Sequence, residues 1–238
     1  MKLYKRAAAL ILTAATLLSL APPVSAEGDR VTISSAKEFY ALVQNCTRDV
    51  WSQGVTVELT ADLDLSGSDF QPIPIFQGTF HGNGHTIRGI TYDHKGSTLG
   101  LFRTLTESAV VEGLCVEGLL EPQGSASQLG LLAGENYGAI RSCSAKGTVS
   151  GQEDVGGLVG VNGETGRIEG SSSQVQISGV TNVGGIAGQN LGTLDRCINT
   201  GALNSDPDQE IPTSVGGVAG LSRGTIQSCS NSGEIGYQ

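Results

Sequence analysis

Two of the chain's three histidines lie four positions apart, at the two ends of the stretch HGNGH. His81 and His85 could bind a metal ion through their imidazole nitrogens if neighbouring segments supplied a further N or O ligand. In this hypothesis Asp93 or His94 supplies it. A zinc protease would carry its two histidines on a helix beside a glutamate, and the sequence contains no HExxH.

The residues between these histidines favour a turn over a helix. Gly82, Asn83 and Gly84 break a helical pattern. The alternative to a metal site is therefore a corner that leads into a strand over residues 85–91.

A second candidate for metal binding is the stretch DLDLSGSD, residues 62–69, which partly resembles a calcium loop. Calcium prefers oxygen ligands, and strand alternation would place Asp62 and Asp64 on one face. An EF-hand loop needs a glutamate at its twelfth position, where Ile73 stands. The alternative is a solvated strand face that runs into a Ser-Gly turn.

The elements that would position these residues are a strand and a helix. In residues 55–65, VTVELTADLDL, every odd-numbered residue is apolar and every even-numbered residue is polar, which predicts one half-buried strand. Residues 35–46, SAKEFYALVQNC, predict a helix that begins with a Ser35–Glu38 capping box. Its apolar residues share one face, which we expect to cap the first coil of the fold. These residues are Phe39, Leu42, Val43 and Cys46.

An internal repeat dominates the rest of the chain. Similar segments begin at Leu99, Leu129, Val155, Val183 and Val215, and the chain contains 35 glycines, about twice the average frequency. Each copy is predicted to contain three short β segments separated by glycine turns, and copies that cannot bury an apolar face alone must stack. The sequence thus predicts an all-β, right-handed parallel β-helix (β-solenoid) with an N-terminal capping helix.

Matching positions of the repeat form three apolar columns that should line the core. The first is Phe102, Leu132, Leu158, Ile186 and Val218; the second is Val111, Ile140, Ile168, Leu194 and Ile226; the third is Leu120, Val149, Ile177, Leu203 and Ile235.

The repeats resemble the GLUG motif, named for its G-L-x-G core. That core stands here as GGLVG (156–160), GGIAG (184–188) and GGVAG (216–220), and FQGTFHGNGHTIRGI (76–90) is similar to the segment that commonly precedes it. The resemblance implies a module of large bacterial surface or secreted proteins, including the non-catalytic part of some IgA-specific metalloproteases.

The N-terminal residues indicate export. MKLYKR, a 15-residue apolar run and Val24-Ser25-Ala26 together predict a signal peptide over residues 1–26. Its removal takes the formal net charge from −9 to −12, which argues against nucleic-acid binding. We expect a cap over 27–54, first coils over 55–98, and five GLUG-like coils over 99–238. The last coil would be uncapped and its open edge covered by further repeats, in a chain that continues or is a fragment.

The cysteines are expected to be buried thiols. Cys143, Cys197 and Cys229 share one column, where other copies carry Leu114 and Ser171. Cys197 and Cys229 would lie in adjacent coils, within reach of a disulfide. Stacked side chains rarely present the required dihedral angle, so free thiols are the favoured interpretation.

Two functions follow from these patterns. The first is a non-enzymatic, exported, cell-surface β-solenoid that acts as a spacer or an adhesive surface toward glycans, host proteins or envelope proteins. Its longest insertion, residues 204–214, is a candidate contact loop. The alternative is a carbohydrate-active β-helix enzyme, a polysaccharide lyase or glycosidase. That enzyme would need clustered carboxylates, and the solvent positions show no aligned acid pair in successive copies. No catalytic residue or cofactor is predicted, apart from calcium as a possible ligand.

Overall fold

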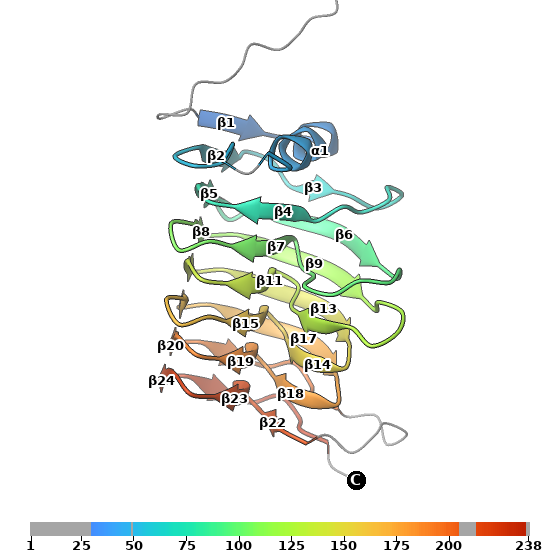
Figure 1. Cartoon of the computed structure of the whole chain (residues 1–238), viewed down its shortest axis with the longest axis vertical. Coiled ribbons are helices and arrows are strands. Elements are labelled where there is room, and N and C mark those ends of the chain that lie inside the picture. Colours follow the sequence, from blue (N-terminus) through green and yellow to red (C-terminus); the bar gives the residue numbers. More distant parts are fainter. Residues whose placement is uncertain (1–29, 49, 205–212, 237–238) are drawn as a thin grey trace, which may run out of the picture.

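The repeats stack into parallel sheets around a single apolar core (Figure 1). The structure, a computed structural model, describes residues 30–48, 50–204 and 213–236. These residues form a parallel β-solenoid of about seven turns with one short helix near the N-terminus. The fold class predicted from the repeat is therefore confirmed. The predicted signal peptide and most of the 204–214 loop lie outside the described residues.

Four sheets run along the solenoid within the described residues, and every strand pair in them is parallel. The eight-stranded sheet contains β1 (Arg30–Ile33), β2 (Thr56–Leu59), β5 (Thr79–His81), β8 (Val110–Glu112), β12 (Ala139–Arg141), β16 (Arg167–Glu169), β20 (Thr193–Asp195) and β24 (Thr225–Gln227). The seven-stranded sheet contains β3 (Leu63–Asp64), β6 (Thr86–Tyr92), β9 (Cys115–Leu120), β13 (Ser144–Ser150), β17 (Ser172–Ser178), β21 (Ile198–Asn199) and β25 (Ser230–Asn231). The six-stranded sheet contains β4 (Ile73–Phe76), β7 (Phe102–Leu105), β11 (Ala133–Asn136), β15 (Val159–Asn162), β19 (Ala187–Asn190) and β23 (Ala219–Ser222). The four-stranded sheet contains β10 (Ser127–Leu129), β14 (Glu153–Gly156), β18 (Thr181–Gly184) and β22 (Val215–Gly216).

Each later coil has four strands, and the prediction of three segments per copy is wrong. The segment VGGLVG is not one strand, because it is interrupted after Gly156 and resumes at Val159. A Cβ atom on Gly157 would lie 2.1 Å from the Ser173 side chain, so this junction has no room for a larger residue. The double glycine therefore divides one apparent strand between two sheets.

Two of the three predicted columns are confirmed by the strand register. Ile140 pairs with Val111 and Ile168, and Val149 pairs with Leu120 and Ile177. The first column needs one correction, because Phe102 pairs with Ala133 and not with Leu132. The backbone N–H of Leu101 donates to the Leu131 carbonyl, which is the parallel-strand bond expected if Leu101 pairs with Leu132. Leu101 therefore takes the place beside Leu132, because the copy that begins at Leu99 has a corner one residue shorter.

The predicted strand 55–65 is also divided. Its buried odd-numbered residues persist through Leu65, but β2 ends at Leu59 and β3 begins at Leu63 in a different sheet. Period-two alternation continues around the corner because the alternate side chains still point toward the axis. Glu58 is consequently not on the same face as Asp62 and Asp64.

The last glycine of each GLUG core lies against a strand of the preceding coil. A Cβ atom on Gly188 would lie 2.3 Å from the carbonyl carbon of Asp154 and 2.4 Å from the Val155 nitrogen. Gly160 and Gly220 stand in the same relation to the backbone of the four-stranded sheet. The motif glycine is thus required by backbone packing between two sheets.

A ladder of buried asparagines joins the later coils. The Asn136 amide donates to Asn162 Oδ1 at 2.8 Å, and the Asn162 amide donates to Asn190 Oδ1 at 2.8 Å. The Asn190 amide then donates to Ser222 Oγ at 3.1 Å. Because the three asparagines are fully buried, these bonds satisfy polar groups that would otherwise be costly to bury.

The helix α1 (Ala36–Asn45) covers the N-terminal end of the core (Figure 1). Ser35 Oγ accepts from the Glu38 backbone N–H, and the Glu38 carboxylate accepts from the Ser34 N–H at 2.8 Å. The predicted apolar face, including Phe39 and Leu42, is buried. No helix among residues 30–48, 50–204 and 213–236 has the length and apolar character needed to cross a lipid bilayer.

The five cysteines are free thiols, as the sequence analysis favoured for Cys197 and Cys229, but Cys115 and Cys229 are only partly buried. Burial raises the pKa of Cys143 and of Cys197 to about 12, which disfavours their reactive thiolate forms. The Cys197 N–H donates to Cys229 Sγ at 3.3 Å, so the two residues are neighbours without a covalent bond.

Candidate functional site

The eight-stranded sheet carries a continuous row of polar residues next to its buried column. Its strands are short, and in β8, β12 and β16 a buried apolar residue is flanked by more exposed neighbours. The third residues of these strands pair from coil to coil and form the polar row: Glu58, His81, Glu112, Arg141, Glu169, Asp195 and Gln227.

Each acidic member of this row contacts a histidine or an arginine. His81 Nδ1 lies 2.8 Å from Glu112 Oε1, and Arg141 Nε lies 3.6 Å from Glu169 Oε2. Asp195, which is buried, pairs with the Arg196 guanidinium. The row therefore presents hydrogen-bonding groups without a large excess of charge.

In each coil from β5 onward a sharp corner of the backbone follows the residue of the polar row and ends the strand of the eight-stranded sheet. Residues in left-handed backbone conformation occupy this corner in successive coils, with φ between 51° and 61°. They are Asn83, Gly113, Ser142, Gly170, Arg196 and Ser228. Only two are glycines, so the sheet pairing on both sides imposes the conformation on Ser142 and Arg196.

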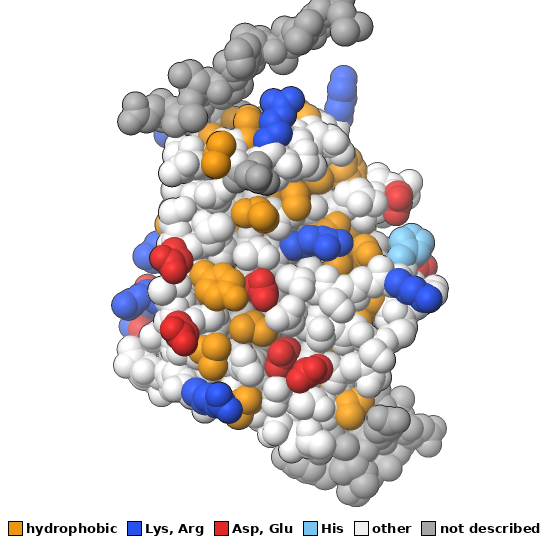
Figure 2. Space-filling view, viewed as in Figure 1, with side chains coloured by type: hydrophobic (Ala, Val, Ile, Leu, Met, Phe, Trp, Pro, Cys, Tyr) orange, Lys and Arg blue, Asp and Glu red, His pale blue; other side chains and the backbone are white. Residues whose placement is uncertain are grey.

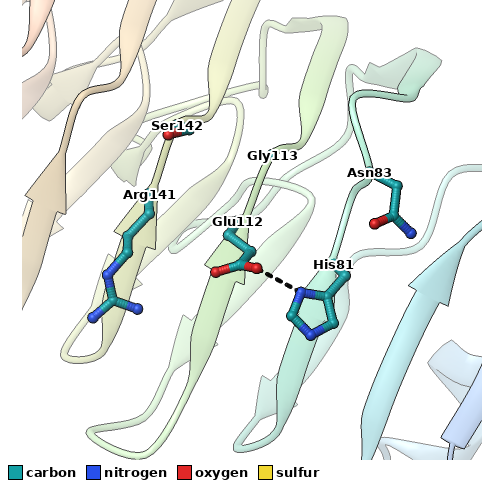
Figure 3. A pocket seen from close by; sticks show the side chains of 6 residues that line it. All are labelled: His81, Asn83, Glu112, Gly113, Arg141 and Ser142. Atoms are coloured by element: carbon teal, nitrogen blue, oxygen red, sulfur yellow. Dashed lines mark hydrogen bonds and ion pairs between the residues drawn. The ribbon is translucent and has the colours of Figure 1, made fainter.

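The row and the corner together form a pocket of about 360 Å³. It is lined by His81, Asn83, Glu112, Gly113, Arg141 and Ser142. Figure 3 shows the His81, Glu112 and Arg141 side chains lying side by side from three adjacent strands. The Asn83 amide is fixed by the Glu58 carboxylate and the Leu59 carbonyl, both at 2.9 Å. The pocket combines an imidazole, a carboxylate, a guanidinium and a hydroxyl.

The histidines predicted as metal ligands do not converge. His81 pairs with Glu112, whereas His85 Nδ1 lies 3.1 Å from Asp62 Oδ1, beside the seven-stranded sheet. The turn between them is a corner, and β6 begins at Thr86, as the alternative interpretation predicted. His81 and His85 thus contact separate carboxylates, and metal binding by them stays a prediction.

The two aspartates of the calcium hypothesis already have partners within the protein. Asp62 Oδ1 accepts from the Thr86 N–H at 3.0 Å, and this bond and His85 hold the pKa of Asp62 below its usual range. Hydrogen bonds from Ser66, and then Arg88 at 3.0 Å, lower the pKa of Asp64 to about 2. Both carboxylates are thus kept ionised by neighbours.

His94 lies apart from the pocket. Its Nδ1 is 3.2 Å from Asp93 and its Nε2 is 3.7 Å from Asp69, so the two carboxylates contact opposite sides of the ring. In the described part of the chain, no group of three His, Cys, Asp or Glu side chains could hold a metal ion. Binding of calcium or another cation stays a prediction.

A smaller pocket of about 280 Å³ lies on the seven-stranded sheet. Glu117 and Lys146 pair in register there, beside Cys115 and Gln174. This second cross-strand pair of charged residues offers a natural comparison for the polar row.

The sequence analysis missed Glu112 and Arg141 as site residues. The strand register places Arg141 in one column with Glu169, Asp195 and Gln227. The same column continued into the preceding copy contains Glu112, so the repeat alignment could have identified it as a neighbour of Arg141. The statement that no acids align in successive copies is wrong, because Glu169 pairs with Asp195.

Comparison with known proteins identifies the repeat. Residues 125–150 and 151–178 match the family described as "The GLUG motif". Two of the repeats are thus GLUG repeats. Gly160, in the second of them, is one of the glycines that pack against the backbone of the four-stranded sheet.

Two curated proteins are similar over part of this chain. "Halomucin" of Haloquadratum walsbyi is 36% identical over 119 residues, which cover 43% of this chain and 1% of halomucin. A "Putative Gly-rich membrane protein" of Evansella cellulosilytica is 33% identical over 96 residues, which cover 38% of this chain and 11% of that protein. The chain thus matches only a small fraction of each relative's length.

A solved structure shares the fold. The "putative immunoglobulin A1 protease" from Bacteroides ovatus aligns with a TM-score of 0.63 and 20% sequence identity. The alignment covers 86% of this chain and 66% of that one. At this identity the likeness concerns the solenoid architecture alone.

Proposed function

We propose that this GLUG-repeat chain is an exported, cell-surface β-solenoid module that acts without catalysis, as a spacer that carries a binding surface. Each coil contacts mainly its neighbours, so the stack provides an extended and regular surface. The names of the two curated relatives, a mucin-like name and a membrane protein, support a location at the cell surface.

The observation that carries the non-catalytic part is the pairing of the carboxylates at the site. A glycosidase needs one carboxylic acid whose pKa is raised so that it can donate a proton. Near the corner, the pKa values of Asp62 and Asp64 are lowered instead, and Glu112 is paired with His81. Asp154, whose pKa is raised by burial, lies on the four-stranded sheet and is held by the Asn182 amide at 2.8 Å.

The enzyme hypothesis retains one specific observation, the stacked carboxylates of Glu169 and Asp195. Adjacent strands are about 4.8 Å apart, close to the separation of carboxylates in retaining glycosidases. Asp195 is buried and paired with Arg196, which disfavours access to a substrate.

The test combines retention with turnover. The exported chain would be incubated with intact bacterial and host cells and, separately, with a panel of polysaccharides, and reducing ends and unsaturated products would be measured. We expect the chain to coat cells and to release no product. Product release that disappears in Glu169→Gln would replace the proposal with the enzyme hypothesis.

A further inference from the structure

The polar row has a spacing that suits a linear polymer. Its members project from strands about 4.8 Å apart, and this distance is close to the length of one pyranose unit. A chain of sugars lying along the solenoid axis would therefore present one unit to each strand. The pocket beside Glu112 is a place where such a chain could seat one unit.

The charges of the row argue for an uncharged ligand. Glu58, Glu169 and Asp195 each contact an arginine, so a charged polymer would have to compete with an existing ion pair at these positions. A neutral ligand faces no such competition. The net charge of −9 for the whole chain further disfavours an acidic polysaccharide.

The lining offers donors and acceptors that remain reachable. The side chains of Glu112 and Arg141 are 43% and 44% exposed, and Arg141 contacts Glu169 through Nε. Arginine has five N–H donors, and a carboxylate accepts several hydrogen bonds, so each group can bind a further partner. Hydroxyl groups both donate and accept, and neighbouring hydroxyls on a sugar ring can contact Glu112 and Arg141 together.

We propose that the polar row, centred on the pocket of His81, Glu112 and Arg141, binds a neutral, linear polysaccharide that lies along the solenoid axis. This inference rests on the proposed function, since it names the ligand class of the surface module. Each sugar contributes a weak contact, and the affinity comes from several contacts made by one chain.

The experiment measures binding of the exported chain to immobilised glycans by surface plasmon resonance. The neutral probes are linear β-1,4-linked gluco-oligosaccharides, manno-oligosaccharides and xylo-oligosaccharides, the acidic probes are polygalacturonate and alginate, and the cationic probe is chitosan. We expect at least one neutral probe to bind, with little change on raising the salt concentration, because no ion pair is formed.

Variants locate the binding. The Glu112→Gln/Arg141→Ala double variant should bind the neutral probe at least tenfold more weakly. The matched control Glu117→Gln/Lys146→Ala alters a cross-strand charged pair on the seven-stranded sheet and should stay within twofold of wild type. If the double variant does not fold, the near-isosteric Glu112→Gln alone should still weaken binding several-fold.

Several results would overturn the inference: equal binding by the site and control variants, binding of the acidic or cationic probes alone, or no binding of any probe. If no probe binds but the chain still coats cells, the proposed surface function stands and only the ligand class fails. If a neutral glycan binds and is shortened, the ligand class stands and the non-catalytic function fails.

Discussion

The aromatic coils, residues 55–122, and the later coils, residues 125–204 and 213–236, build the same solenoid by different means. In the aromatic coils Phe76, Phe80 and Phe102 form a cluster with ring centroids 5.4–6.2 Å apart. At the register position of Phe102 the later coils carry Ala133, Val159, Ala187 and Ala219.

The later coils replace bulk with close backbone contact and hydrogen bonds. Gly188 admits the backbone of the preceding coil, and the asparagine ladder joins one coil to the next. Leu105 occupies the ladder's position in the aromatic coils. The two regions show that one stacking geometry accommodates two kinds of interior, one filled by large side chains and one narrowed by glycines that let the backbones approach.

The surface does not share this contrast in an obvious way. Figure 2 shows apolar, acidic and basic side chains interspersed over one face.

The largest effect should come from breaking the aromatic cluster. Phe102→Ala introduces a residue that later coils carry at the same register. It should nevertheless cost about 3–5 kcal/mol of unfolding free energy, because removal of the Phe102 ring leaves a cavity beside Phe76 and Phe80. Urea unfolding would measure the loss. Val159→Ala, at the same register in a later coil, removes fewer carbons and should cost less; equal losses would contradict the comparison.

The next effect concerns the motif glycine. Gly188→Ala places a Cβ 2.3 Å from backbone atoms that cannot rotate away, so we expect a loss of about 3 kcal/mol, at the upper end for overpacking. The control is Gly124→Ala, where nothing lies within 4 Å and only the positive φ is strained, for about 1 kcal/mol. Similar losses in thermal unfolding would show that packing between the sheets does not explain the motif.

A smaller effect should follow from interrupting the asparagine ladder. Asn162→Leu imitates Leu105 but removes the partner of Asn136 and Asn190, so it should cost about 2 kcal/mol. Asn162→Ser should cost less, because Ser222 already ends the ladder with one hydrogen bond. If Leu is tolerated as well as Ser, the ladder contributes shape alone.

The smallest effect is on the pH dependence of the unfolding free energy, to which one carboxyl group in each region should contribute with opposite sign. The pKa of Asp64 is about 2 against an ordinary 3.8, so its stabilisation is present above about pH 4 and is lost as the pH falls toward 2. Burial raises the pKa of Asp154, so its protonated form favours folding, and this contribution is lost as the pH rises through that raised value. NMR titration of the two carboxyl groups would test this; shifts in the same direction would contradict it.

The sequence was informative where a residue's structural role depends on residues near it in the chain. The period predicted the stack, and the alternation of Val57 and Leu59 predicted the buried face. The capping box at Ser35 and Glu38 predicted the start of α1, because a helix terminus is satisfied by residues a few positions away. The candidate pocket was not predicted, because His81 and Glu112 are 31 residues apart and meet only once the register is known.

What the sequence alone determined is the class of fold: repeated apolar columns must be buried, and only stacking buries them. Tertiary structure decided the rest. It divided VGGLVG between two sheets, shifted Phe102 by one residue, and gave His81 and His85 separate carboxylate partners. The physical reason is that contacts between coils depend on corner length, and one residue more or less at a corner changes which side chains meet.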